Sequence, residues 1–307
     1  MSLMTLFSTP KPFNDPLIST IQWNAIKSWL EFGDQVEVIL IGEEEGVANV
    51  SESLGVKYLP DVKRNDQGTP LVSSIFELAR QNSSSPHMCY INADIIVFDD
   101  LINTTNLISR VYEKFLIVGQ RWDLNVVDRI KYTAGWQRQL QEELKKFGKL
   151  HPRGGSDYFV FPKACFEHIP EFAIGRAGWD NWMFYEARTN RWPLVDATES
   201  IQIIHQQHDY RHLPQGQPHY RLPESGENIK LAGGEIAIFD LQDTDRRVVN
   251  GKIRKPDPSL RKIFREVEIS PLTILNSKPL GWAFYSLFHP KRGYWLLRKK
   301  LGAFFRK

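Results

Sequence analysis

The sequence MCYINADIIVF, residues 88–98, is an apolar run that only Asn92 and Asp94 interrupt. Such a run predicts a strand that is buried on both faces, as strands of parallel sheets are. Polar side chains inside it need partners, because an unpaired carboxylate among apolar neighbours costs free energy. In open α/β sheets ligands bind where strands end, so Asn92 and Asp94 are candidate ligand-binding residues. The alternative is that Asp94 caps a turn.

The sequence before this run alternates short apolar segments with segments of helical period, which predicts βαβ units around a mostly parallel sheet. Further strands are expected at residues 4–8, 36–42, 56–60 and 115–118. One helix is expected to bury Leu17, Ile21, Ala25 and Trp29, and a second, over residues 70–80, to begin at Pro70 and bury Leu71, Ile75, Leu78 and Ala79. The expected fold class is α/β, with a Rossmann-like, mixed and mostly parallel sheet flanked by helices.

Beyond Gln120 the alternation of apolar and helical segments is less regular. A helix carrying Trp136, Leu140, Leu144 and Phe147 is expected before HPRGGSDYFVFPK (151–163), where a glycine pair precedes a strand. Residues 213–235 are rich in Pro, Gly and charge, which indicates a long loop or a junction. We therefore divide the chain into a Rossmann-like half (1–120), a second half of the same domain (121–212) and a C-terminal extension (213–307).

Composition places the chain among ordinary globular proteins, with 42% hydrophobic and 24% charged residues in 307. Cys89 and Cys165 lie in apolar runs, which favours buried thiols in a reducing, cytoplasmic compartment over disulfides. The sequence shows neither a signal peptide nor an uncharged run of 18 residues, so we expect no transmembrane helix. The net charge of +3 is too small to indicate a nucleic-acid partner.

Asp180 stands between Trp179 and Trp182 in GRAGWDNWMF, residues 175–184. Aromatic walls raise the pKa of a carboxylate by desolvation, toward the range of a general base, and offer flat surface for a sugar ring. The alternative is an Asp that caps a helix ahead of a core aromatic pair.

A histidine-rich segment, IQIIHQQHDYRH (201–212), contains His205, His208, Asp209 and His212 after a strand-like run. Imidazole and carboxylate groups suit a divalent metal. The spacing does not match HExxH, and the alternative is a surface loop.

Together these segments resemble the GT-A fold nucleotide-diphospho-sugar transferases, a superfamily of glycosyltransferases, over roughly residues 4–212. YINADIIVFDD resembles the D-x-D-type motif that ends a strand there, with Asp94 at its last position and Asn92 in place of the first acid. The resemblance implies transfer of a sugar from a nucleotide-diphosphate sugar to an acceptor hydroxyl, with Mn²⁺ or Mg²⁺ held by Asp94 and by His205 or His208.

The same resemblance implies the other roles. Asp180 looks like the general base of inverting members, or a residue that orients the acceptor in retaining ones. The acceptor, a carbohydrate or a lipid-linked group, is expected at Arg121, Gly154, Gly155, Asp157, Trp179 and Asn181. The donor is expected at Phe7, Thr9, Pro10, Glu43, Gly68, Thr69, Ser73, Asn92 and Asp94, with the backbone N–H groups near Gly68 helped by a helix dipole. The sequence holds no GxGxxG or GxxxxGK[ST] motif, which disfavours a dinucleotide enzyme or a P-loop NTPase.

The C-terminal sequence HPKRGYWLLRKKLGAFFRK, residues 289–307, mixes aromatic and aliphatic residues with seven Lys and Arg and no acid. That mixture is typical of interfacial helices and predicts peripheral contact with an anionic membrane. The alternative is a helix packed on the domain with its charges solvated.

Two other functions fit parts of the sequence. One is a metal-dependent phosphohydrolase that uses His205, His208 and Asp209. The other is a non-catalytic carbohydrate- or membrane-binding protein with a degenerate donor site, which Asn92 and the basic tail suggest.

Overall fold

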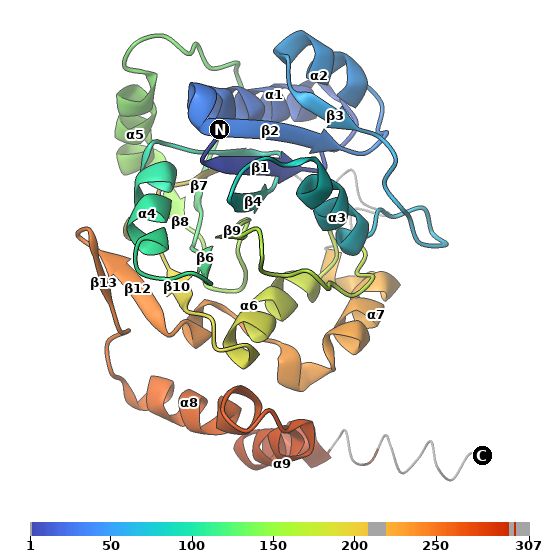
Figure 1. Ribbon diagram of the computed structural model, residues 1–307, viewed down its shortest axis with the longest axis vertical. Helices are drawn as coiled ribbons and strands as arrows, with labels where there is room; N and C mark the ends of the chain where they lie inside the picture. The colour runs from blue at the N-terminus through green and yellow to red at the C-terminus, as the bar shows by residue number, and fades with distance from the viewer. Residues whose placement is uncertain (1, 208–218, 295–297, 299–307) are drawn as a thin grey trace.

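The computed structural model describes residues 2–207, 219–294 and 298, and its centre is a nine-stranded sheet of order β13-β12-β10-β6-β9-β4-β1-β2-β3 (Figure 1). The strands are β1 (Met4–Ser8), β2 (Val36–Ile41), β3 (Lys57–Leu59), β4 (His87–Ile91), β6 (Leu116–Val118), β9 (Tyr158–Pro162), β10 (Leu194–Asp196), β12 (Arg246–Val249) and β13 (Lys252–Arg254). Most neighbours pair in parallel; β9 is antiparallel to β4 and β6, and β13 to β12. The expected mixed, mostly parallel sheet is confirmed.

Helices cover both faces of this sheet, because its buried strands point alternate side chains into two apolar cores. Leu6 faces the core formed with α1 (Pro16–Leu30), α2 (Val47–Leu54) and α4 (Asp100–Ser109). Phe7 faces the core formed with α3 (Val72–Asn82) and α6 (Trp179–Thr189), to which α7 (Pro223–Ala232) and α8 (Leu260–Thr273) contribute. Both cysteines are buried and free, as expected.

The quoted run 88–98 is not one strand, which corrects the prediction. β4 ends at Ile91, the chain turns at Asn92–Asp94 with Ile95 N donating to Asn92 O, and β5 (Ile95–Ile96) joins a second sheet. That sheet has the order β5-β11-β7-β8, formed with β7 (Trp122–Leu124), β8 (Lys149–Leu150) and β11 (Ile204–Gln206). Its outer face packs on α5 (Trp136–Phe147). The polar residues therefore mark the point where the chain changes sheets.

The antiparallel strand β9 brings distant segments to one edge of the large sheet. The carboxyl ends of β1, β2 and β4 lie at this edge because these strands run parallel. Since Ile91 at the end of β4 pairs with Tyr158 at the start of β9, Asp157 lies beside Asn92, and Asn92 N donates to Asp157 O at 3.0 Å. The candidate site is built at this edge.

Four local predictions differ from the structure. Leu17 and Phe147 are exposed, because each lies at the end of its helix where the apolar stripe has no neighbouring element to cover it. Helix α3 begins at Val72, after Pro70 and Leu71, which take part in isolated bridges with Arg64 and Ala173. Residues 213–235, predicted as a loop or junction, contain helix α7 with Pro223 in its first turn. A proline there is favourable, since its missing N–H would have no helical partner.

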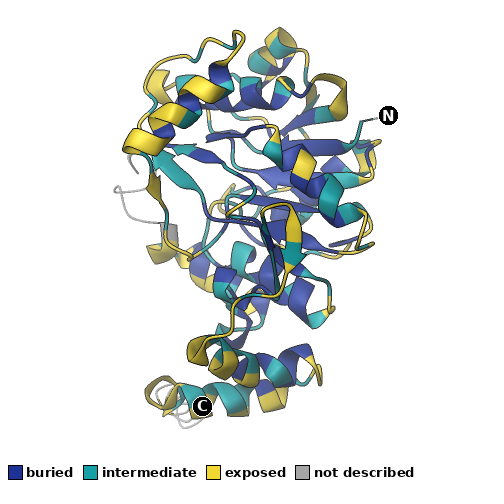
Figure 2. Ribbon diagram, turned by 90° about the vertical axis from the view of Figure 1, so that its left-hand side faces the viewer, coloured by how far each residue is buried: buried dark blue, intermediate teal, exposed yellow. Residues whose placement is uncertain are grey.

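Helices α8 and α9 (Lys278–Phe288) lie together at one end of the long axis of the molecule (Figure 2). They pack closely: a Cβ at Gly281 of α9 would lie 2.4 Å from Leu272 Cδ2 of α8. Among residues 2–207, 219–294 and 298, no helix combines the length and apolar character that crossing a bilayer requires.

Candidate active site

Asp157 is held by side chains from two other strand ends. Arg121 Nη1 donates to both carboxylate oxygens of Asp157, at 2.9 Å each. Asn92 Nδ2 donates to Asp157 Oδ1 at 2.8 Å, and Tyr90 Oη donates to Asn92 Oδ1 at 3.2 Å. Charge-assisted hydrogen bonds of this kind fix the orientation of a carboxylate.

These contacts explain why Asn92 stands where the D-x-D-type motif has an acid. Its amide donates to Asp157, whereas an ionised aspartate at this position would accept only and would repel that carboxylate. Asn92 therefore helps to hold the Asp157 carboxylate in place, and Asp94 is the remaining acid of the segment.

Asp94 lies next to His205, one of the two histidines predicted as its partner. His205 Nε2 is 3.8 Å from Asp94 Oδ2, while His205 Nδ1 is 3.1 Å from Asp123 Oδ1. Strand pairing causes this arrangement, because His205 is in register with Ile95 of β5 and with Asp123 of β7. The buried Gln206 fixes the turn by donating from Nε2 to Asp94 O. The other predicted partner, His208, and also Asp209 and His212 lie outside the described residues.

Three further residues lie around Asp94 and His205 but were not predicted as site residues from the sequence: Asp123, His151 and Lys11. Burial alone would raise the pKa of Asp123, but hydrogen bonds with His205 and His151 and the charge of Arg121 lower it overall. Burial lowers the pKa of Lys11, and the Asp94 charge opposes that shift, which places an ammonium group near Asp94. Two features of the sequence could have pointed to them: Asp123 is an acid inside the short apolar strand WDL, and Lys11 is a lysine that follows the first strand.

Asp180 lies in the first turn of α6, behind Trp179. The Trp179 ring packs in the core, with ring centroids 5.1 Å from Tyr90 and 5.3 Å from Phe159. It therefore supports the helix start instead of lining an open surface. Asn181 Nδ2 donates to Phe239 O at 2.6 Å, which ties the same turn to the C-terminal extension.

The carboxylate of Asp180 is partly exposed but closely surrounded by protein. Burial raises its pKa, the negative charge of Asp157 adds to the rise, and backbone N–H groups of Asn181 and Gly178 partly offset it, giving about 6. Asp180 is therefore near Asp157, and through Asp157 it is connected to Arg121 and Asn92. A carboxylate with this pKa is ionised at neutral pH and accepts a proton more readily than an ordinary one.

Gly155 leaves room for that carboxylate. A Cβ at Gly155 would lie 2.7 Å from Asp180 Oδ2, whereas a Cβ at Gly154 would meet nothing within 4 Å. Neither glycine has a positive φ, so alanine fits the backbone at both. We expect Gly155→Ala to displace the Asp180 carboxylate; if that carboxylate takes part in a reaction, a shift of ~1 Å should lower kcat about 10- to 100-fold.

The matched control for this prediction is Gly154→Ala, assayed under the same conditions with Tm measured for both variants. It should keep kcat within about twofold of the parent protein. Equal activity of the two variants would mean that the Asp180 position does not matter to the reaction.

The predicted donor residues at the end of β1 are mostly buried. The Phe7 ring is fully buried against Phe76, 5.0 Å away, so its side chain belongs to the core, and Pro10 is also buried. The hydroxyls of Ser8 and Thr9 are buried, and neither makes a hydrogen bond within the part of the chain that the structure describes. Buried polar atoms of this kind cost free energy unless a ligand or water satisfies them.

At the end of β2, the acidic residues Glu43 and Glu44 surround Arg64. Arg64 Nε is 3.2 Å from Glu43 Oε1, and Arg64 Nη2 donates to Glu44 Oε1 at 2.9 Å. Glu43 is largely exposed beside the Thr9 strand end. Gly42 permits the Glu44 carboxylate to fold back, because a Cβ there would lie 2.2 Å from Glu44 Oε2.

The predicted N–H groups of Gly68 and Thr69 are used within their own loop. Gly68 N donates to Asn65 O and Thr69 N to Asn65 Oδ1, each at 2.9 Å. Asn65 in turn donates to Glu224 of α7 at 2.8 Å. The loop therefore packs on α7, and the expected cradle of free N–H groups is not formed by these two residues. Ser73 lies partly buried in the first turn of α3.

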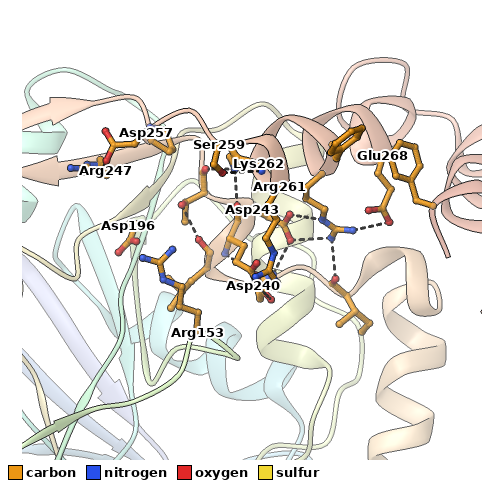
Figure 3. A pocket seen from close by; sticks show the side chains of 18 of the residues that line it. Arg153, Asp196, Asp240, Asp243, Arg247, Asp257, Ser259, Arg261, Lys262 and Glu268 are labelled. Atoms are coloured by element: carbon orange, nitrogen blue, oxygen red, sulfur yellow. Dashed lines mark hydrogen bonds and ion pairs between the residues drawn. The ribbon is translucent and has the colours of Figure 1, made fainter.

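An open pocket of about 1190 Å³ lies between the α/β body and helices α8 and α9 (Figure 3). Ion pairs shape its walls, among them Arg247–Asp257 at 2.5 Å and Arg265–Asp243 at 2.7 Å. Neither Asp94, Asp180 nor His205 lines it. Its lining is linked to Asp180 through Arg153, because Arg153 precedes Gly155 by two residues and Gly155 lies against the Asp180 carboxylate.

No protein-family model matches the sequence. A search of curated proteins finds no match either. One similar solved structure is the mannosyltransferase PcManGT from Pyrobaculum calidifontis in complex with GDP-Man and Mn²⁺, with a TM-score of 0.41 and 12% sequence identity. The alignment covers 66% of this chain and 56% of that one, so the chain spans little more than half the length of that structure. Similarity at this level is too low to assign a function.

Proposed function

We propose that this protein is a metal-dependent glycosyltransferase, which transfers a sugar from a nucleotide-diphosphate sugar to an acceptor hydroxyl. The observation that carries the proposal is the arrangement of Asp94, His205 and Asp123 close to Arg121, which holds Asp157, with Asp180 of α6 near Asp157. It combines a pair of metal-type ligands with a separate carboxylate whose pKa is raised to about 6.

Asp94 and His205 fit a divalent ion. A carboxylate oxygen and an imidazole nitrogen that each lie about 2.1 Å from an ion are between about 3 and about 4.2 Å apart, depending on the angle between them. The observed separation of 3.8 Å falls in this range. Asp123 on the second nitrogen of His205 matches the carboxylate–histidine pairs that orient metal-bound imidazoles.

The remaining ligands would come from the donor and from water. Residues 2–207, 219–294 and 298 contain no group of three or more His, Cys, Asp or Glu side chains placed to hold a metal ion. Mg²⁺ commonly binds through one or two carboxylates plus substrate phosphates, and Mn²⁺ accepts imidazole as well. When bound, the ion supplies charge neutralisation for the departing diphosphate.

The donor is proposed to lie across the ends of β1 and β2. The unsatisfied hydroxyls of Ser8 and Thr9 and the exposed Glu43 carboxylate offer hydrogen-bonding groups to a nucleoside there. Lys11, close to Asp94, adds positive charge on the diphosphate side. In this proposed placement the sugar would face Asp157 and Asp180.

Asp180 is proposed to accept the proton of the attacking acceptor hydroxyl. Arg121 and Asn92 hold Asp157, whose charge keeps the pKa of Asp180 raised, and Gly155 leaves the carboxylate in place. Positioning of the two substrates and this proton transfer are the contributions of the chain itself. The acceptor, a carbohydrate or a lipid-linked group, would extend toward Arg153 and the pocket beyond it.

The proposal is tested by a thermal-shift screen of UDP-, GDP-, dTDP- and ADP-sugars, with and without Mn²⁺. One donor is expected to raise Tm by several degrees only when the metal is present, because a ligand at 100 times its Kd stabilises a fold by about 2.7 kcal/mol. Metal-dependent release of phosphate from simple esters, with no shift by any nucleotide sugar, would instead indicate a phosphohydrolase. Donor binding without turnover of any acceptor would indicate a non-catalytic binding protein.

A further inference from the structure

Helix α8 carries an apolar face that the described chain leaves open. Leu260, Ile263, Phe264 and Val267 follow one another at spacings of three, one and three residues, which places them on one side of the helix. Ile274, the residue directly after the helix, follows Val267 at a spacing of seven. The side chains of all five are between 47% and 75% exposed. Scattered exposed apolar residues are ordinary, but exposed apolar residues gathered on one side of a helix indicate an interaction surface. We call these five residues the α8 stripe.

The opposite side of α8 is anchored firmly to the body. Ile269 and Leu272 are buried in the core beside α6. Arg265 bonds Asp243 at 2.7 Å, and Glu266 is paired with Arg188 of α6 at 2.8 Å. The α8 stripe is therefore presented by a fixed helix, and a frayed terminus does not explain its exposure.

The location of the α8 stripe suits a flat partner. Helices α8 and α9 form the lower end of the molecule in Figure 1. Leu275, Leu280 and Leu287, near or on α9, are also exposed, so apolar side chains continue beyond α8. A broad surface that approaches this end meets α8 and α9 before the nine-stranded sheet.

The net charge of the chain also differs between its C-terminal end, which includes α8 and α9, and the rest. Residues 252–307 contain fourteen Lys and Arg and three Asp and Glu, a net charge of +11. Because the whole chain carries +3, residues 1–251 carry −8. An anionic surface would attract the C-terminal end and repel the rest, which orients the molecule before contact.

We propose that α8 docks on an anionic lipid bilayer through the α8 stripe. Exposed apolar residues on a segment of positive net charge are the combination that lies in a membrane interface, whereas a nucleic acid binds through its phosphates to basic side chains and would leave the aliphatic residues exposed. The α8 stripe lies on a helix anchored to the body and is separate from the basic tail predicted from sequence (residues 289–307), most of which lies outside the described residues. It goes beyond the proposed sugar transfer and does not depend on it.

The test is co-sedimentation of the full chain with vesicles of phosphatidylcholine, alone or with about one-third phosphatidylserine. The triple variant Leu260→Ser, Ile263→Ser, Val267→Ser is compared with Val111→Ser, Val127→Ser, Leu150→Ser, which changes exposed apolar residues elsewhere. We expect the anionic vesicles to bind the parent protein at least about tenfold more strongly than neutral ones, and the α8 triple variant to lose about tenfold in partition while the control triple does not.

Further measurements distinguish lipid docking by the α8 stripe from misfolding of the variant and from self-association of the chain. Each variant should keep its Tm, because the changed side chains are exposed, and binding should weaken as NaCl rises from about 0.1 to about 0.5 M. Equal binding by the parent and the α8 triple variant would overturn the proposal, as would a parent protein that does not bind anionic vesicles. A concentration-dependent dimer in light scattering that the triple variant abolishes would assign the α8 stripe to a second copy and also overturn it. The Asp94→Asn variant should bind vesicles like the parent, so this result is independent of the proposed activity.

Discussion

Asp180→Asn is expected to lower kcat about 10³-fold while leaving metal-dependent donor binding in place. A positioned general base contributes about 10²- to 10⁴-fold to proton transfer, and asparagine keeps the size of the side chain but accepts no proton at pH 7. The measurement is steady-state turnover with the donor identified by thermal shift, together with the donor-induced change in Tm. The matched control is Asp34→Asn, an exposed carboxylate near the start of β2, at the opposite edge of the sheet.

The pH profile adds a second readout for Asp180. Because the base must be ionised, and its pKa is raised to about 6, kcat/KM should fall about tenfold for each pH unit below 6 in the parent protein. The acid limb should disappear in Asp180→Asn. If the variant keeps more than about a tenth of kcat, or keeps the acid limb, another group accepts the proton, or the reaction retains configuration and Asp180 orients the acceptor.

The loss of activity expected for Asp180→Asn should not come from unfolding of the protein. The pKa of Asp180 is higher in the folded protein than in the unfolded chain, where it is ordinary. Its ionisation therefore weakens the fold as pH rises from about 4 to about 6, and removes nothing further above that range. Asparagine lacks this charge, so Tm at neutral pH should equal or exceed that of the parent protein.

The sequence predicted the strand ends but not the way they meet. Periodicity placed β1 at its observed bounds and located β2, β3 and β6, because buried parallel strands are nearly continuous apolar runs. It did not show that the run 88–98 changes sheets at Asn92–Asp94. That turn depends on pairing between β5 and β11, more than a hundred residues apart, which no local pattern encodes.

Local sequence patterns likewise identified several residues of the candidate site but not how they contact one another. Asp94, Asp157, Asp180 and His205 were chosen by residue type and order, and the structure places Asp94 beside His205 and Asp180 near Asp157. Asp123 escaped notice because its importance comes from register with His205 across parallel strands. Gly68 and Thr69 were chosen from composition, which does not reveal that Asn65 accepts from both N–H groups. Helical period likewise predicts an apolar face, but it does not tell which of two faces on α8 is buried.

Asp94→Asn is expected to abolish the metal-dependent rise in Tm caused by the donor and to lower kcat by about 10²- to 10³-fold. Removing a group that stabilises developing charge on a leaving oxygen has effects of this size. His205→Gln should act in the same way, because both side chains would hold one ion. Since the two residues act as a unit, the double variant should lose little more than either single one. Turnover is measured against Mn²⁺ concentration, so that weaker metal binding is distinguished from a slower reaction.

Asp123→Asn is expected to have a smaller effect on metal binding than Asp94→Asn. Asp123 touches His205 Nδ1 but not the proposed ion, so its loss should weaken metal affinity by about 10- to 100-fold and be rescued by excess Mn²⁺. Asp94→Asn should not be rescued. This order of effects distinguishes a metal site from a purely structural cluster, in which Asp123 would matter as much as Asp94 because it also holds Arg121 and His151. A metal-dependent donor shift that survives Asp94→Asn would place the ion elsewhere, and the proposed roles of Asp94 and His205 would then be wrong.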